Sequence, residues 1–210
     1  MREEYTRQLE LLNNELTQMG GLIESAIANA VKALDGDEHA IKKACDFEKD
    51  INRAEKEIEN LCLKLFLTQQ PVATDLREIS AALKMITDME RIGDQAEDIA
   101  EIAATAKSTP YMERSKYVQR MAAATIDMVD KSISAFIKKD LCIVEDVIHS
   151  DEVVDALFDD VKNELLTAIR NNTNDEGVLD MLMVAKYFER IGDHAVNIAE
   201  WVQFSITGEL

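Results

Sequence analysis

Apolar residues recur at intervals of three and four positions along nearly the whole chain. The first stretch shows the pattern in Leu9, Leu12, Leu16, Met19 and Ile23. This spacing places the apolar side chains on one face of an α-helix, and no alternating pattern typical of β-strands competes with it. The chain is therefore predicted to form six helices, at about residues 3–34, 37–67, 73–106, 111–138, 141–170 and 175–206.

Helix-breaking residues are few and well separated. Clear breaks occur at 35–37 (Asp-Gly-Asp), 68–71 (Thr-Gln-Gln-Pro), 107–110 (Lys-Ser-Thr-Pro) and 171–174 (Asn-Asn-Thr-Asn), whereas the boundary at Lys139-Asp140 has neither Gly nor Pro. Long helices joined by short turns pack as antiparallel neighbours. The expected fold class is therefore all-α.

A twelve-residue motif occurs twice, 99 residues apart. Residues 90–101 (ERIGDQAEDIAE) and 189–200 (ERIGDHAVNIAE) are identical at nine of twelve positions, and residues 48–52 resemble 151–155 more weakly. Such similarity indicates duplication of a unit of about 100 residues. We expect two tandem three-helix bundles related by a pseudo-twofold axis, with domains at 1–107 and 108–210 and the motif on the third helix of each.

The repeated motif carries oxygen-bearing side chains one helical turn apart. Residues four apart lie on the same helix face, where like charges repel, so the repeat favours a bound cation over a merely solvated face. Oxygen-rich sites suit Mg, Mn, Ca or ferric iron, and the motif lacks the Cys and paired His typical of zinc sites. The candidate metal ligands are Glu90, Asp94 and Asp98 in the first copy and Glu189, Asp193 and Asn197 in the second.

Further candidate metal ligands follow if the second and third helices of each half pack antiparallel to each other. This estimate places Glu48 level with Asp94 and Asn52 level with Glu90. In the second half it places Asp151 level with His194 and Asp155 level with Ile191. We therefore expect acidic groups from two adjacent helices to face each other, with Glu48, Asn52, Asp151 and Asp155 as additional ligands.

Other residues of chemical interest have plainer explanations. Gly93 and Gly192 cost about 1 kcal/mol each inside a helix, which favours close helix approach, with room for a ligand as the alternative. His149 lies four residues after Glu145 but is expected to be a partly exposed histidine, and His194 is replaced by Gln95 in the first copy. The methionines are expected to fill core gaps, among them Met85, Met89, Met181 and Met183.

Composition excludes several classes of protein. The net charge of −18 argues against binding nucleic acid or anchoring by a basic segment, and is compatible with cations or a basic partner. No apolar run approaches the roughly 18 residues of a membrane span, and the first residues do not form a signal peptide.

Cys45, Cys62 and Cys142 form no CxxC pair, so we expect buried, reduced thiols in a cytosolic protein. No phosphate-binding loop, GxSxG motif or nucleophile beside a base is present, so we expect no enzyme.

The doubled Glu-Arg-Ile-Gly-Asp motif resembles the paired signature of the PhoU family, the accessory and regulatory proteins of bacterial phosphate-specific transport. Residues 71–77 (PVATDLR), the chain length and the six helices fit the same family. Asp98 departs from the Asn usual at its position, and Gln95 from the usual His, so the two sites are expected to differ.

The resemblance implies a cytoplasmic, usually homodimeric protein that negatively regulates the phosphate-starvation response. Its implied partners are the ATPase subunit of the phosphate ABC transporter and the phosphate-sensing histidine kinase. Any association with the inner membrane would be indirect, by binding to these partners. It also implies metal ions at the acidic motifs, as divalent or ferric ions (Mg, Mn, Fe or Zn). The residues themselves leave two alternatives open, a metal-dependent hydrolase using clustered cations and a plain helical scaffold.

Overall fold

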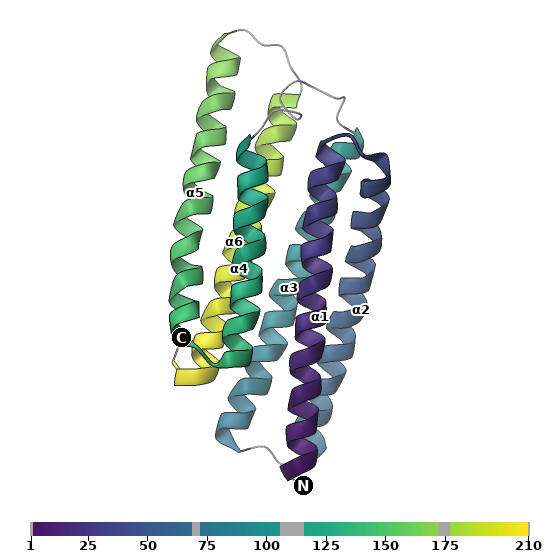
Figure 1. Ribbon diagram of the computed structural model, residues 1–210, viewed down its shortest axis with the longest axis vertical. Helices are drawn as coiled ribbons and strands as arrows, with labels where there is room; N and C mark the ends of the chain where they lie inside the picture. The colour runs from purple at the N-terminus through teal and green to yellow at the C-terminus, as the bar shows by residue number, and fades with distance from the viewer. Residues whose placement is uncertain (1, 69–71, 106–115, 172–176, 210) are drawn as a thin grey trace.

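The chain folds into six long helices that run up and down along one axis (Figure 1). The computed structural model describes residues 2–68, 72–105, 116–171 and 177–209. Its helices confirm the six predicted from periodicity, and the predicted residues 106, 111–115 and 175–176 lie outside the described ranges. The helices are α1 (Arg2–Leu34), α2 (Glu38–Thr68), α3 (Ala73–Thr105), α4 (Lys116–Lys138), α5 (Leu141–Arg170) and α6 (Gly177–Thr207).

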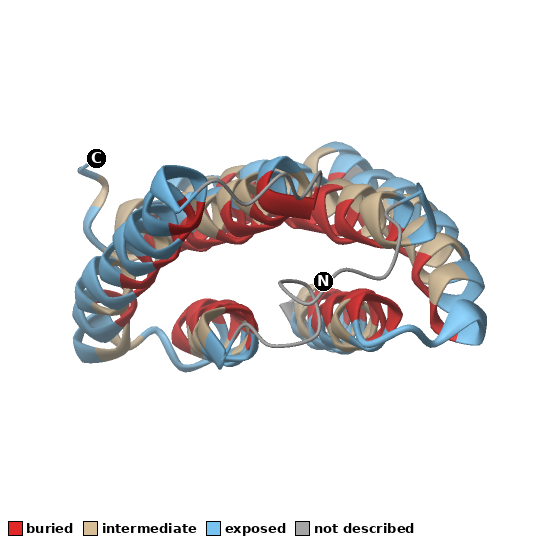
Figure 2. Ribbon diagram, turned by 90° about the horizontal axis from the view of Figure 1, so that it is seen from above, coloured by how far each residue is buried: buried red, intermediate tan, exposed pale blue. Residues whose placement is uncertain are grey.

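Four helices form a curved layer, and the first helix of each half covers its concave side (Figure 2). Each half is a three-helix bundle in which every helix contacts the other two. The halves meet where α3 packs on α6 and α1 packs on α4, whereas α2 and α5 each contact only helices of their own half. The contacts of one half are thus repeated in the other, which is the pattern expected of a pseudo-twofold arrangement. The expected boundary between residues 107 and 108 lies outside the described residues.

The core follows the predicted apolar face of each helix. Leu12, Leu16, Met19 and Ile23 of α1 are fully buried. The third helices α3 and α6 lie in the middle of the layer and pack against each other and against both other helices of their own half. They are therefore covered on more sides than α2 or α5, and this position brings the two copies of the motif into the centre of the molecule.

Two expectations about the core are wrong in part. Of the three cysteines, which are all free, only Cys62 is buried, since Cys45 is half-buried and Cys142 is exposed in the first turn of α5. Met183 is also exposed, whereas Met85, Met89 and Met181 are buried as predicted. Cys142 and Met183 each lie two positions from a buried residue, Val144 and Met181, so they point away from the buried face of their helices.

The turns explain where the described helices break. Gly36 adopts a φ of +91°, which glycine tolerates, and Asp37 accepts a hydrogen bond from the backbone N–H of His39 at the start of α2. At the predicted boundary without glycine, Lys139 itself takes a φ of +53°, and Asp140 caps α5 by accepting from the N–H of Cys142 at 2.9 Å. Both predicted breaks are confirmed.

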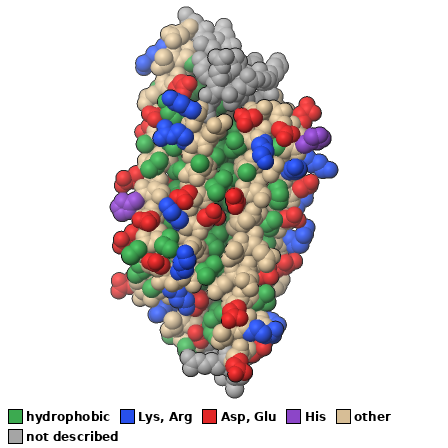
Figure 3. Space-filling view, viewed as in Figure 1, with side chains coloured by type: hydrophobic (Ala, Val, Ile, Leu, Met, Phe, Trp, Pro, Cys, Tyr) green, Lys and Arg blue, Asp and Glu red, His purple; other side chains and the backbone are tan. Residues whose placement is uncertain are grey.

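The outer face of α1 and α4 carries interspersed acidic and basic side chains (Figure 3). None of the described helices has the unbroken apolar length that a membrane span requires.

The turn between α4 and α5 is tied back to the first half by a partly buried ion pair. Lys139 Nζ lies 2.8 Å from Oε2 of Glu78 on α3, whose side chain is only 9% exposed. Replacing Lys139 by Met should lower the free energy of unfolding by about 1–2 kcal/mol, because the Glu78 carboxylate loses its cation. Urea unfolding measures the change, with Lys138→Met at the same exposed helix end as the control. Equal, negligible losses in both variants would show that the pair does not stabilise the fold.

Candidate functional site

The repeated motif lies on α3 and α6 with its apolar side in the core. Met89, Ile92, Ala96 and Ile99 of α3 are fully buried. The acidic side chains of the same helix turns are left half-buried, and α2 packs beside them. The second half repeats this arrangement with α5 beside α6, except that Asp193 is exposed. The packing of the layer therefore determines which acidic groups can meet.

The first acidic cluster consists of carboxylates from two adjacent helices: Glu48 and Glu55 on α2, and Glu90, Asp94 and Glu97 on α3. Burial, reinforced by the charges of Glu97 and Asp94, raises the pKa of Glu48. Burial and the charge of Asp94 likewise raise the pKa of Glu90. Glu48 therefore lies within electrostatic reach of the motif carboxylates on the neighbouring helix.

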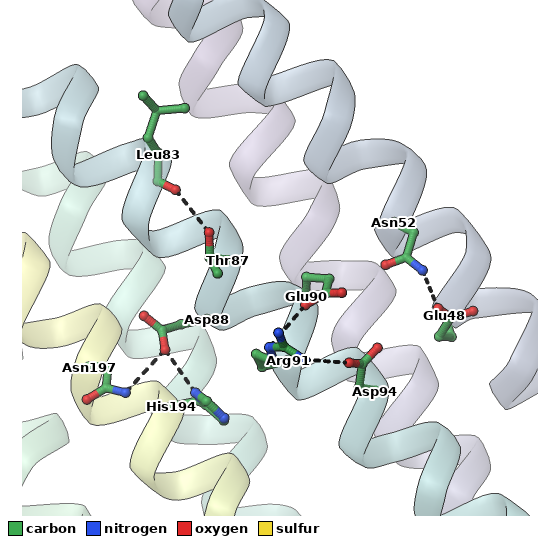
Figure 4. Close-up of polar contacts among 10 residues, drawn as sticks. All are labelled: Glu48, Asn52, Leu83, Thr87, Asp88, Glu90, Arg91, Asp94, His194 and Asn197. Carbon is green, nitrogen blue, oxygen red and sulfur yellow. Dashed lines mark hydrogen bonds and ion pairs between the residues drawn. The ribbon is translucent and has the colours of Figure 1, made fainter.

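Neighbouring groups partly neutralise the first acidic cluster (Figure 4). The exposed Arg91 guanidinium lies between two carboxylates, with Nε 3.6 Å from Glu90 Oε2 and Nη1 3.4 Å from Asp94 Oδ2. On α2, Asn52 donates a hydrogen bond from Nδ2 to Glu48. Exposed ion pairs of this kind are worth little, so Arg91 compensates the cluster only in part.

The second acidic cluster consists of Asp151 and Asp155 on α5 with Glu189 and Asp193 on α6. Burial and the charges of Asp155, Asp193 and Glu189 raise the pKa of Asp151 to about 6. The Oδ1 atom of Asp151 is buried and has no hydrogen-bond partner within the described part of the chain. Here Lys186 forms an ion pair with Glu189 and lies 5.7 Å from the ring centroid of Phe158.

The two repeated glycines allow the helices of each cluster to approach closely. A Cβ atom at Gly93 would lie 3.0 Å from Cδ1 of Ile51, and one at Gly192 would lie 2.9 Å from Oδ1 of Asp151. Such distances are too short for an ordinary contact, which supports the close-approach interpretation in both halves. At Gly192 the missing side chain also makes room for the unpartnered carboxylate oxygen of Asp151.

The last predicted ligand of each motif faces the other half of the chain. Asn197 of α6 donates from Nδ2 to Oδ1 of Asp88 on α3 at 3.1 Å, and Nδ1 of His194 lies 2.8 Å from the same oxygen (Figure 4). In the reciprocal position, Tyr187 of α6 faces Asp98 of α3 and lowers the pKa of this carboxyl, against the larger raising effect of burial. We call this contact between α3 and α6, with these five side chains, the seam.

The described residues contain no ready metal site, because no three His, Cys, Asp or Glu side chains converge within them. Glu90 and Asp94 face α2, and Glu189 and Asp193 face α5. Asp98 and Asn197 lie on the seam, where Asp98 faces Tyr187 and Asn197 binds Asp88. His149 is exposed, with Nδ1 2.8 Å from the backbone oxygen of Glu145, so it forms no ligand pair with that side chain. The assignment of all these residues as metal ligands remains a prediction.

Four residues of the site were missed from the sequence. Glu55 lies seven positions after Glu48 on the same face of α2, so helical spacing contained a signal for it. Lys186 lies three positions before Glu189 and was equally accessible to this argument. Asp88 and Tyr187 lie just outside the repeated motif and differ from each other, so no pattern marked them.

Comparison with known proteins identifies the same family for both halves. The family model described as "PhoU domain" matches residues 16–103 and 118–202. A relative from Clostridium acetobutylicum, named phosphate-specific transport system accessory protein PhoU homolog, is 34% identical over 99% of this chain and 96% of its own length.

Solved structures agree with this assignment. The crystal structure of PhoU from Pseudomonas aeruginosa is 31% identical, covers 98% of this chain and 100% of its own, and gives a TM-score of 0.86. The phosphate transport system regulatory protein PhoU from Streptococcus pneumoniae, at 22% identity and 98% coverage of both chains, shares the fold with a TM-score of 0.88. The chain therefore belongs to the PhoU family, a family of accessory and regulatory proteins of phosphate transport and not of enzymes.

Proposed function

We propose that this chain is a cytoplasmic adaptor that keeps the phosphate-starvation response repressed while phosphate is plentiful. It would do so as a homodimer that links the ATPase subunit of a phosphate ABC transporter to a phosphate-sensing histidine kinase. The observation that carries this proposal is the match of both halves to the PhoU domain, together with a relative named for phosphate-specific transport over nearly its full length. The three free cysteines are compatible with a reducing compartment.

We further propose that the two acidic clusters bind metal cations. Glu90 and Asp94, with Glu48 and Asn52, would hold a cation in the first half. Glu189 and Asp193, with Asp151 and Asp155, would hold one in the second, and Asp98 and Asn197 would contribute from the seam. Oxygen ligands of this kind suit Mg, Mn or Fe better than Zn.

The chemistry of the donor groups supports a cation in the second cluster most directly. Asp151 Oδ1 is a buried carboxylate oxygen without a partner, in the space left by the missing side chain of Gly192. A bound cation supplies the positive charge that this oxygen and its acidic neighbours lack. Since no three ligands converge among the described residues, the carboxylates would have to draw together around the ion.

A cation in either cluster would tie two helices together. The first cluster joins α2 to α3 and the second joins α5 to α6, so bound ions would stiffen the edges of the four-helix layer and change their charge. Both effects would alter how those edges dock to a partner. The proposed role of the ions is therefore to adjust docking, and the proposal assigns them no part in a reaction.

The raised pKa of Asp151 predicts a pH-dependent stability in metal-free protein. Its pKa rises from 3.8 to about 6 on folding, so the folded state holds this proton more firmly, and stability is lost as the pH rises from about 4 through 6. Replacing Asp151 by Asn should raise the free energy of unfolding by about 1–2 kcal/mol at pH 8, after allowance for solvent screening, and much less at pH 4.

Urea unfolding in the presence of a chelator measures this difference, with the exposed neighbour change Glu152→Gln as the control. The same gain at both pH values would show that the effect does not come from the ionised Asp151 carboxylate.

Calorimetric titration with Mn²⁺ tests cation binding. Wild-type protein should release heat at two kinds of site, Glu90→Ala/Asp94→Ala should lose one, and Glu189→Ala/Asp193→Ala should lose the other. Asp160→Ala/Glu164→Ala removes an equally spaced exposed acidic pair on α5 and should leave the titration unchanged. Identical heats from all four proteins would remove both proposed sites.

Deleting the gene tests the regulatory role. Phosphate-scavenging functions should be switched on at high phosphate in the deletion strain and repressed again when the wild-type gene is restored, because the kinase no longer receives the signal of sufficient supply. Reporter expression from a phosphate-starvation promoter is the measurement. Unchanged expression at high phosphate would contradict the proposed negative regulation.

A further inference from the structure

Exposed apolar side chains gather where the C-terminal part of α5 lies beside the N-terminal part of α6. We call the four of them the apolar patch, and each is between 42% and 67% exposed: Leu166, Ile169, Leu179 and Met183. We propose that the apolar patch and the second acidic cluster together bind a basic amphipathic helix of a partner protein. This inference rests on the adaptor function proposed above and adds the docking surface and the chemistry of the partner.

The packing of α5 on α6 brings the members of the apolar patch to the same height. Lys186 Nζ lies 5.7 Å from the ring centroid of Phe158, and this contact fixes the register of the two helices. Leu166 lies eight residues after Phe158, and Leu179 lies seven residues before Lys186. Because the helices are antiparallel, both leucines lie about 10–12 Å from that contact in the same direction (Figure 1). The other two members lie within about one turn of them.

The apolar patch continues the surface that carries the second acidic cluster. Ile169 lies 18 residues after Asp151, which is five helical turns, so both occupy the same side of α5. Leu179 lies about two turns before Lys186, on the side of α6 whose cation pairs with Glu189. Helix α6 contacts α4 on the concave side of the layer and α3 and α5 on its flanks. Its exposed side chains therefore belong to the convex face (Figure 2).

The first half shows that the fold does not require apolar side chains at these positions of α6. Ser80 lies 99 residues before Leu179, and the exposed Lys84 lies 99 residues before Met183. Helix α3 makes the same set of helix contacts as α6 with these polar residues in place. Exposed apolar side chains gain little from the folded chain itself, and a contiguous group of them marks an interaction site.

The charge around the apolar patch favours a basic partner. Residues 151–170 and 177–200 contain ten acidic and four basic side chains, and two of the basic ones, Lys162 and Lys186, form ion pairs on their own helices. Asp151 Oδ1 is buried without a hydrogen-bond partner among the described residues. A second copy of this chain, with its net charge of −18, or an anionic lipid surface would add negative charge here. Lys and Arg side chains of a partner supply the opposite charge.

The shape of this surface suits a helix. The described structure is built of helices and offers no strand edge that an extended peptide could join. From Leu179 to Glu189 the surface runs ten residues, or about 15 Å, along α6. A partner helix of about three turns laid alongside would place apolar residues on the apolar patch and Lys or Arg on the acidic cluster.

Peptide binding to the full chain tests the proposed surface. The probe is a fluorescently labelled Leu/Lys peptide of about 16 residues with its leucines on one helical face, and binding is measured by fluorescence anisotropy. Leu179→Ser/Met183→Lys installs the residues of the first half and should weaken binding about 10-fold or more, because two apolar contacts are lost and a like charge is added. Leu11→Ser/Ile137→Lys makes the same charge change at exposed positions of α1 and α4, and should change affinity less than about 2-fold.

Two further measurements separate this partner from other occupants. A Leu/Glu peptide with the same apolar pattern should bind at least about 10-fold more weakly than the Leu/Lys peptide. Equal losses in the two double variants, or equal binding of the two peptides, would overturn the proposal. Dissociation of a wild-type dimer by Leu179→Ser/Met183→Lys, measured by sedimentation velocity, would assign the apolar patch to a second copy and overturn it too. Thermal unfolding establishes that each variant is folded, and Leu179→Ser alone carries the test if the double variant is not.

Reporter expression at high phosphate separates this surface from the adaptor function itself. Leu179→Ser/Met183→Lys should release the phosphate-starvation promoter as deletion does, whereas Leu11→Ser/Ile137→Lys should keep it repressed. Full repression by Leu179→Ser/Met183→Lys at wild-type protein level, in a strain where deletion releases the promoter, would overturn the docking surface and leave the adaptor standing. Unchanged expression on deletion would contradict the adaptor, and the peptide titration would still decide the surface.

Discussion

Close apolar packing of neighbouring helices forces carboxylates together, and the rest of the site follows from this constraint. Ile51 packs onto Gly93 in the first half, and Val154 packs near Gly192 in the second. Because glycine allows the backbones to approach, the acidic residues flanking these contacts come level with one another. Burial, reinforced by their mutual repulsion, raises the pKa values of Glu48, Glu90, Asp151 and Asp193. The fold thus creates two regions of negative charge that its own cations offset only in part.

The duplication has kept this arrangement while changing its details. Arg91 offsets the first cluster from within the motif, whereas Lys186 offsets the second from the preceding turn. The contact between α3 and α6 joins the two clusters at the centre of the layer, where Asp88 reaches into one motif and Tyr187 into the other. The two acidic clusters are therefore related by the duplication but unequal in their compensating charges.

The sequence predicted most of the fold because helical periodicity and burial have the same physical cause. All six helices followed from it, and the fold-back estimate placed Glu48 near Asp94 because long straight helices preserve register. Cys142 and Met183 were misjudged because residue type was followed in place of helical position, since each lies two positions from the buried Val144 or Met181 and so points away from the buried face. The role of Asp88 had no signal in the sequence, because it depends on how far α3 is rotated toward α6. The seam therefore emerged only from the packed structure.

The central claim is that the doubled carboxylate clusters hold positive ions. The most direct test is anomalous X-ray scattering from crystals of the full chain grown with Mn²⁺. The account predicts one anomalous peak or group of peaks between Glu90 and Glu48, and a second between Glu189 and Asp151, with the side chains drawn toward each. Well-diffracting crystals in which both positions lack an anomalous signal, while Arg91 and Lys186 remain paired with the carboxylates, would contradict it.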